Sequence, residues 1–459
     1  MNANSLEALD RRHWIHPVAS WSEHEERGPT ILAAGRGAYL TDSEGRELVD
    51  GFSGLWCVNV GYGQESVIEA ALQQMRRLPY ATGYFGFASE PAIRLAARLA
   101  QLTPGDLDHI FFTLGGSDAV DTALRFIRYY FNVTARPDKK QIISLERGYH
   151  GSSSQGAGVT SLPVFHAQFD LPTPEQHRIA SPYPYRNPVG ADGEAVIAAS
   201  TAALRAKVAE IGADKVAAFF CEPVQGSGGV IVPPRGWLRA MRETARELDI
   251  LFVADEVITG FGRTGPMFAC EAEDVVPDML TMAKGLTCGY APMGALAISE
   301  PIYRAIADAT PRGTPVGHGF TYSGHPVSAA VALAVLDLYT QGGLLQQGQA
   351  AGERLEARLS ELAAHPLVGE VRSRGLLAGI EIVADKASKT RFSREARVAE
   401  KLTARSRENR VIFRAFADDI IGLAPALCCT GGDIDLIVER VRRCLDDMLD
   451  LREIRAELR

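Results

Sequence analysis

The sequence lacks a long uninterrupted hydrophobic run. No window approaches the roughly 18 consecutive apolar residues that cross a bilayer. The first residues, MNANSLEALDRRHW, carry charge early and contain no continuous apolar stretch. We therefore expect neither a membrane span nor a secretory signal, and we expect a cytoplasmic protein.

The sequence also lacks the spacings that mark disulfide frameworks and metal sites. Its seven cysteines include no Cys-x-x-Cys pair, and its ten histidines include no close pair on one helical face. This predicts reduced thiols and no bound metal. A basic tract is missing too: the formal net charge is −8 with both signs mixed along the chain. We therefore expect no nucleic-acid partner.

The composition that is present, 46% hydrophobic and 23% charged, is typical of a globular protein with a large core. Between about residues 110 and 299, apolar β-rich runs alternate with amphipathic segments, which predicts a parallel sheet covered by helices. A helix is expected over Ser117–Phe131, and the proline-rich stretch Leu171–Pro188 is expected to form a loop. The expected strands are Ile110–Thr113, Gln141–Leu145, Val216–Cys221, Ile250–Ala254 and Gly294–Ile298.

After about residue 326 the pattern changes to that of a separate α+β domain. Two long helices are expected at Ala329–Thr340 and Ala350–Ala364, followed by a strand at Leu376–Val383. A further helix and then a strand around Val411–Phe416 are expected after it. Near the N-terminus, Ala38–Thr41 and Glu47–Asp50 flank a turn and predict a hairpin that joins this domain. We therefore predict a large domain of residues 60–325 and a small domain of residues 1–59 and 326–459.

An acidic residue and a lysine stand at the ends of two apolar runs. Asp255 closes LFVAD, and Lys284 follows DMLTMA. Ligands of open parallel sheets bind outside the carboxyl ends of the strands, so both side chains would project into one crevice. A lysine after an apolar run is more often a solvated surface residue, but the pairing with Asp255 favours a functional role. Pyridoxal 5′-phosphate (PLP) requires these two residue types: an amine that holds its aldehyde as a Schiff base, and a carboxylate that keeps its ring nitrogen protonated.

Two weaker signals agree with this cofactor. The run Leu114-Gly115-Gly116-Ser117 between a predicted strand and a predicted helix would let backbone N–H groups approach a phosphate. Tyr149, just after another predicted strand, is placed to stack on a pyridine ring. Taken alone, the glycine run could be an ordinary turn before a helix, and Tyr149 could be an aromatic residue that caps a loop.

The same segments resemble the class III aminotransferases of the fold-type I PLP family, in the ω-transaminase (amine:pyruvate) group. The resemblance implies an α/β fold, with a mostly parallel seven-stranded sheet in a large PLP-binding domain and a smaller α+β domain. It extends over essentially the whole chain, through DGFSGLWCVNVGYG (50–63), FFTLGGSDAVDT (111–122), ERGYHGSS (146–153), CEPVQGSGGVIVPP (221–234), LFVADEVITGFGRTG (251–265), AKGLTCGYAPMGA (283–295) and HGFTYSGHP (318–326).

Carried over residue by residue, the resemblance assigns Lys284 to the Schiff base and Asp255 to the pyridinium nitrogen. The other residues that it implies for cofactor binding are Tyr149 and Val257 on the two ring faces, Gly116 and Ser117 at the phosphate, and Glu222 and Gln225 beside the cofactor.

The resemblance also implies that Phe320 and Thr321 reach the phosphate of the neighbouring subunit. It therefore predicts a homodimer with shared active sites, or a tetramer built from two such dimers. One departure is visible, since Asp118 stands where the phosphate segment commonly has a glutamate. This shortens a side chain beside the site without removing the phosphate donors.

On the substrate side, Trp56, Tyr84 and Phe85 match the aromatic wall of the ω-transaminases, and Arg414 matches a mobile arginine that pairs with a carboxylate. Outside that context Trp56 would be assigned to core packing and Arg414 to a surface ion pair. The resemblance implies transfer of an amino group from an amine or ω-amino acid to a keto acid, with pyruvate expected, by a ping-pong mechanism. The sequence does not identify the donor.

Four other functions are alternatives to this one. The run Gly260–Gly265 matches G-x-G-x-x-G after a strand, but no amphipathic helix follows it, which argues against dinucleotide binding, and no Walker-type phosphate loop is present. Another PLP reaction, decarboxylation or an aminomutase shift, would use the same Lys284 and Asp255. A non-catalytic binding subunit is disfavoured because both residues are present.

Overall fold

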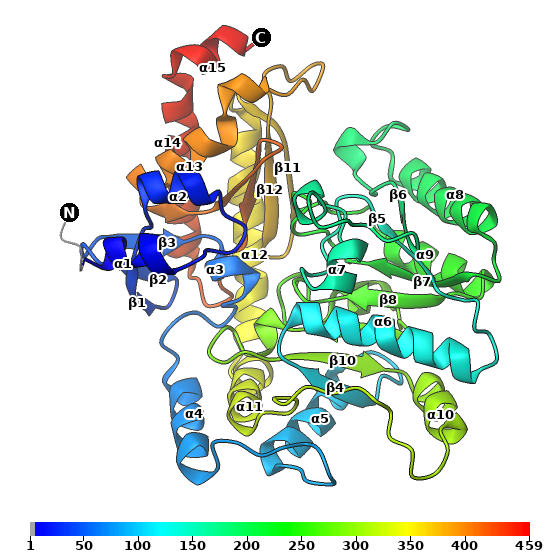
Figure 1. The fold of residues 1–459 in the computed structure, drawn as a ribbon. Helices are drawn as coiled ribbons and strands as arrows, with labels where there is room; N and C mark the ends of the chain where they lie inside the picture. Colours follow the sequence, from blue (N-terminus) through cyan, green and yellow to red (C-terminus); the bar gives the residue numbers. More distant parts are fainter. Residues whose placement is uncertain (1–4) are drawn as a thin grey trace.

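A seven-stranded sheet forms the centre of the larger part of the molecule (Figure 1). The structure is a computed structural model that describes residues 5–459. All strands run parallel except β10, which is antiparallel to both neighbours. The order across the sheet is β4 (His109–Thr113), β10 (Gly294–Ile298), β9 (Met279–Met282), β8 (Leu251–Asp255), β7 (Val216–Cys221), β5 (Gln141–Leu145) and β6 (Gln176–Ile179).

All five expected strands of this sheet are present, and the structure differs from the prediction in three further respects. The β6 strand lies inside the predicted Leu171–Pro188 loop. It is a short polar strand at the sheet edge, so it carries no apolar run that would predict it. Strand β9, the run before Lys284, was not among the expected strands. Strand β10 is reversed because no covering helix separates it from β9, and a short connection suffices for antiparallel neighbours.

Apolar residues on both faces explain why the central strands are buried. Phe219 packs in a cluster with Trp237 of α9, whereas the next residue, Phe220, packs on the other face with Ile127 of α6. Alternate side chains of a strand point to opposite faces, so helices must cover both. The helices of this part are α4 (Glu65–Arg77), α5 (Glu90–Leu102), α6 (Gly116–Val133), α7 (Ser154–Val159), α8 (Gly193–Ile211), α9 (Trp237–Glu247), α10 (Glu300–Ala309) and α11 (Pro326–Thr340).

The N-terminal and C-terminal segments lie together on the other side of the molecule (Figure 1). An antiparallel sheet has the order β11 (Val368–Arg374), β12 (Leu377–Ile382), β15 (Ile420–Leu423) and β14 (Arg414–Phe416). A second sheet has the order β1 (Leu32–Arg36), β2 (Tyr39–Asp42), β3 (Glu47–Asp50) and β13 (Val411–Ile412). The helices here are α1 (Leu6–His13), α2 (Trp21–Arg27), α3 (Ser53–Trp56), α12 (Leu344–Ser360), α13 (Val398–Glu408), α14 (Gly431–Leu449) and α15 (Arg452–Glu457).

The strand expected around Val411–Phe416 is in fact two strands in two sheets. Strand β13 pairs in parallel with β3 of the N-terminal hairpin, and β14 pairs antiparallel with β15. The chain crosses between the sheets at the buried Phe413. An apolar run does not reveal such a crossing, because it does not show which strand each residue pairs with. The crossing places Arg414 at the first position of β14.

Within residues 5–459, no single helix is long and apolar enough to cross a membrane. Helix α11 together with the segment Leu344–Ala364 passes the same test of length and composition, but the pair is bent by 64° at its break.

A buried arginine ties three distant segments together. Arg263 is fully buried, and its guanidinium donates hydrogen bonds to the side-chain oxygen of Asn59 at 2.6 Å and to the carbonyl oxygen of Pro425. Its backbone carbonyl accepts from the amide of Leu376 at 3.0 Å. Burial lowers the pKa of Arg263 to about 10, and no carboxylate within the described chain forms an ion pair with it. The two oxygen acceptors therefore carry the stabilisation of this cation.

We predict that Arg263→Ala lowers the free energy of unfolding by about 2–4 kcal/mol, because it leaves two buried acceptors unsatisfied and opens a cavity. The midpoint of urea unfolding measures this. Arg354→Ala is the matched control, since that arginine is about half exposed in its ion pair with Asp435 and should cost at most about 1 kcal/mol. Equal losses in the two variants would contradict the prediction.

Candidate active site

A cavity of about 470 Å³ opens at the carboxyl ends of β8 and β9. It lies between the large sheet and the N- and C-terminal segments, because its walls come from both. Most of the residues predicted for the site line it: Trp56, Gly116, Ser117, Tyr149, Glu222, Asp255, Val257, Lys284 and Arg414.

The carboxylate of Asp255 is held by three donors at the end of β8. One oxygen accepts from the hydroxyl of Thr281 at 3.0 Å and from the amide of Val257 at 3.1 Å, and the other is 2.8 Å from Nδ1 of His150. Asp255 is only 4% exposed. A carboxylate offers about four acceptor positions, so one position is left for a further donor in the cavity.

The side chain of Lys284 lies in the same cavity, just after β9. Its ammonium is 5.4 Å from the centre of the Trp56 ring. Burial lowers the pKa of Lys284 to about 8, although the nearby thiol of Cys57 and the carboxylates of Asp255 and Glu222 oppose that shift. Its φ of +37° lies in the left-handed region, a conformation that non-glycine residues adopt at a cost. A strained lysine with a lowered pKa can supply a neutral amine near neutral pH.

The first turn of α6 points its backbone N–H groups at the cavity. Gly115 caps this 18-residue helix without a side-chain hydrogen bond, so the first N–H groups have no side-chain partner. A Cβ on Gly116 would stand 2.9 Å from a methyl of Val257, which explains why glycine is needed there. The hydroxyl of Ser117 accepts from the amide of Ser152 at 3.2 Å and lines the same wall. Such a helix start favours a bound anion.

Glu222 and Tyr149 form one side of the cavity. The buried carboxylate of Glu222 accepts from the amides of Tyr149 and Gly226, each at 2.9 Å, and burial raises its pKa to about 7. Gln225 is buried next to this wall but does not line the cavity, and its side-chain oxygen has no hydrogen-bond partner among the described residues. Its amide nitrogen donates to the carbonyl oxygen of Glu146 at 2.8 Å.

Arg414 faces the cavity from β14 as a cation next to two aromatic rings that stack on each other, Trp56 and Phe416. Its guanidinium carbon lies 5.4 Å from the Trp56 ring centre and 4.9 Å from that of Phe416. Burial lowers its pKa, and Tyr149 partly opposes that change. Within residues 5–459 no carboxylate pairs with Arg414, so the alternative assignment, a surface ion pair, does not hold and the guanidinium remains available to a ligand.

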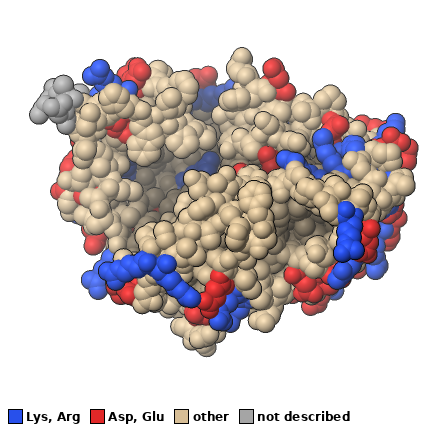
Figure 2. Space-filling view, turned by 60° about the horizontal axis from the view of Figure 1, so that its bottom comes forward, with Lys and Arg blue, Asp and Glu red and all other residues tan. Residues whose placement is uncertain are grey.

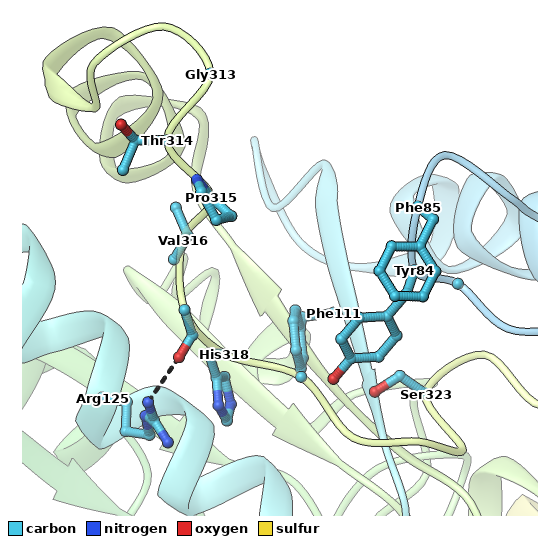
Figure 3. A pocket seen from close by; sticks show the side chains of 13 residues that line it. Tyr84, Phe85, Phe111, Arg125, Gly313, Thr314, Pro315, Val316, His318 and Ser323 are labelled. Carbon is cyan, nitrogen blue, oxygen red and sulfur yellow. Dashed lines mark hydrogen bonds between the residues drawn. The ribbon is translucent and has the colours of Figure 1, made fainter.

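Four predicted site residues lie elsewhere in this chain. Tyr84 and Phe85 line a second cavity of about 870 Å³, together with the loop that contains His318 and Ser323 (Figure 3). Phe320 and the exposed Thr321 belong to the same loop, where the carbonyl oxygen of Thr321 accepts from the hydroxyl of Tyr80 at 2.9 Å. The Phe85 side chain is 89% exposed. These four residues do not line the Lys284 cavity of this chain.

The structure adds residues that the sequence did not single out. Thr281 of β9 and His150 of the loop after β5 hold Asp255, and Pro17 and Val18 of the N-terminal segment line the mouth of the cavity. His150 follows Tyr149 within the segment ERGYHGSS, so the sequence contained a signal that could have identified it. The pairing that brings Thr281 beside Asp255 depends on the register of β8 and β9.

The cavity fits one ligand that has an aldehyde, a ring nitrogen that carries a proton, and a phosphate. Lys284 can hold the aldehyde, the free acceptor position of Asp255 can accept from the protonated ring nitrogen, and the start of α6 can bind the phosphate. PLP combines all three groups. The sheet topology and this cavity therefore define a PLP-dependent enzyme of fold type I.

The chain belongs to the class III aminotransferases. The profile of the family Aminotransferase class-III matches residues 21–445. The family resemblance, the expected fold class and the expected PLP cofactor are thereby confirmed, and the protein is an aminotransferase that transfers amino groups to keto acids.

Individual relatives cover nearly the whole chain. The putrescine–pyruvate aminotransferase of Pseudomonas aeruginosa is 40% identical over 97% of both chains. The crystal structure of an (S)-enantioselective ω-transaminase from Thermomicrobium roseum superposes with a TM-score of 0.94, at 40% identity, covering 98% of this chain and 99% of that one. An ω-transaminase from Pseudomonas jessenii in complex with PMP gives a TM-score of 0.95 at 36% identity, covering 97% and 98%.

We predict that His150→Ala slows the reaction with an amine about 10–100-fold, because a hydrogen bond to a charged group contributes about 1.5–3 kcal/mol. His150→Asn should restore most of the loss, since its amide can donate from nearly the same position as Nδ1. Single-turnover kinetics with one amine measures both. A merely structural role for His150 predicts equal losses in the two variants.

Proposed function

We propose that the enzyme moves an amino group from a primary amine or ω-amino acid to pyruvate, and that both substrates use the Lys284 cavity in turn. The observation that carries this proposal is Arg414, a cation without a carboxylate partner in the described chain, which lies beside two aromatic rings at the cavity wall. A keto acid brings the missing carboxylate, whereas a simple amine can contact the rings. The curated relative from Pseudomonas aeruginosa is named for putrescine and pyruvate.

We propose the following roles in the cofactor site. Bound PLP supplies the electron sink for loss of the substrate's α-proton. Asp255 keeps the ring nitrogen protonated, and the start of α6, with Gly116 and Ser117, binds the phosphate. Tyr149 and Val257 line the two ring faces, with Glu222 and Gln225 beside them.

Lys284 has two proposed tasks. It holds the aldehyde through its amine, and once a substrate amine has displaced it, the same nitrogen moves the α-proton. A pKa of about 8 supports both, since a useful fraction of the side chain is neutral near pH 7. Replacement by alanine removes the amine without changing the rest of the cavity wall.

We further propose a homodimer in which each subunit completes the other's site. Tyr84, Phe85, Phe320 and Thr321 lie outside the Lys284 cavity of their own chain, and large aromatic side chains near them are exposed. Figure 2 shows the face at the bottom of Figure 1, where charged side chains gather toward the rim and the middle is mainly uncharged. Such a face is suited to contact with a second copy. A tetramer of two dimers would use the same contact.

The proposed domain division, residues 60–325 against 1–59 with 326–459, is supported by the pairing of β3 with β13. Helix α11 packs against α4 and α5, so it would link the two parts. The seven cysteines are free, which agrees with the proposed cytoplasmic location.

The proposed reaction predicts a colour change. The purified protein should be yellow, an accepted amine should bleach it without any keto acid, and pyruvate should restore the colour. Visible absorbance measures all three steps, and Lys284→Ala is the control that should give neither bleaching nor recovery. Recovery with 2-oxoglutarate but not with pyruvate would refute the proposed acceptor, and a yellow protein that no amine bleaches would refute the donor class.

The proposed role of Arg414 predicts a selective loss. Arg414→Ala should slow recovery by pyruvate about 10–100-fold, because a charge-assisted pair with the carboxylate is lost. Bleaching by a simple monoamine should change much less. Arg414→Lys keeps the charge without the bidentate geometry and should lie between the two. Equal losses in both half-reactions would rule out this recognition role.

The proposed assembly predicts a mass in solution of at least twice the 49.6 kDa of the chain. Light scattering after size exclusion measures it. Phe85→Asp should shift the mass toward the monomer and lower activity, because a buried charge would destabilise the contact. A fully active monomer would contradict shared sites.

A further inference from the structure

Two histidines and an aspartate meet near the N-terminus, outside the cofactor site. Asp10 lies on α1, His24 lies on α2, and His16 lies in the connection between them. Nε2 of His16 is 2.8 Å from one carboxylate oxygen of Asp10, and Nε2 of His24 is 2.7 Å from the other. Their side chains are 10–23% exposed, so the cluster is shielded from solvent.

The geometry around His24 is not that of a hydrogen-bonded pair. Its Nε2 is buried and close to the carboxylate, yet within the described chain it has no hydrogen-bond partner with acceptable geometry. The His16 and His24 rings are also only 4.4 Å apart between centroids. A cation bound by both imidazoles and the carboxylate would give the buried Nε2 of His24 a partner.

We propose that Asp10, His16 and His24 bind a divalent transition-metal ion, with Zn²⁺ as the best match, and that this ion fixes the connection between α1 and α2. The three ligand atoms lie within 4.8 Å of one another. Zinc bonds to nitrogen and oxygen are about 2.0–2.2 Å long, so small side-chain rotations place an ion between them. Two imidazoles with one carboxylate select such ions over Mg²⁺ and Ca²⁺, and leave a position for water.

This ion would act on the mouth of the Lys284 cavity. The connection that carries His16 also carries Pro17 and Val18, which line that cavity. Val18 is 69% exposed and has a φ of +50°, so packing alone does little to hold it. Because the ligands come from both flanking helices and the connection, the bound ion would fix the conformation of the connection between α1 and α2. The spacing of the histidines predicted no metal, because the ligands come from two helices and a connection and not from one helical face.

Binding is tested on the holoenzyme in metal-free buffer. Equilibrium dialysis with ZnCl₂, and visible absorption with CoCl₂, should give one ion per chain. His16→Asn and His24→Asn should each weaken binding about 100-fold or more, since even loss of a residue behind the ligands costs 10–100-fold. His13→Asn is the matched control, because His13 is exposed on α1 and outside the cluster.

Equal binding by all variants would show an adventitious ion only and overturn the proposal, as would no binding to the wild type. The cofactor absorbance of each variant without metal checks that it is folded. Limited trypsin digestion tests the second half of the proposal. Zn²⁺ should slow cleavage after the exposed Arg12 in the wild type and in His13→Asn, but not in His24→Asn. Unchanged cleavage of the wild type would refute the proposal that the ion fixes this connection.

Discussion

The anchoring of one buried carboxylate is the constraint on which the rest of this site depends. A carboxylate that is 4% exposed is tolerated only when donors satisfy it, and the donors of Asp255 come from strand β9, the segment after β8 and the loop after β5. The hydrogen bond from Thr281 forms only if β9 pairs with β8 in the observed register. The contact with His150 forms only if the loop after β5 extends past β7 to the end of β8. The same strand order brings Lys284 and the start of α6 to the same edge. The strand order that defines the fold therefore also positions the residues of the site.

Much of this could be read from the sequence because it rests on local patterns. Strands β5, β7 and β10 have the expected bounds, since buried strands carry continuous apolar runs, and Asp255 and Lys284 follow such runs. The polar edge strand β6 and the division at Phe413 could not be predicted, because both depend on tertiary pairing. The same holds for His24 and Asp10, which meet only after α1 and α2 pack. Tyr84 and Thr321 were assigned by resemblance, and one chain cannot place them against a neighbour.

Electrostatically, the cavity keeps its charges in separate regions. Asp255 and Glu222 lie deep beside the sheet, where burial raises the pKa of Glu222, while Arg414 faces the cavity from the other side against Trp56. Lys284 lies between these groups, and its lowered pKa reflects burial that is only partly offset by the carboxylates. The aromatic rings hold that arginine without neutralising it.

The crossing at Phe413 has a consequence for how such enzymes diversify. The parts proposed for the cofactor belong to the large sheet, whereas Arg414 belongs to a different sheet and is positioned by where the chain leaves β13 for β14. Lengthening or shortening that passage by one residue would turn the guanidinium to the opposite face of its strand. Such a change leaves Lys284 and Asp255 untouched. The residue proposed to recognise the acceptor can thus change its orientation without any change in the residues proposed to bind the cofactor.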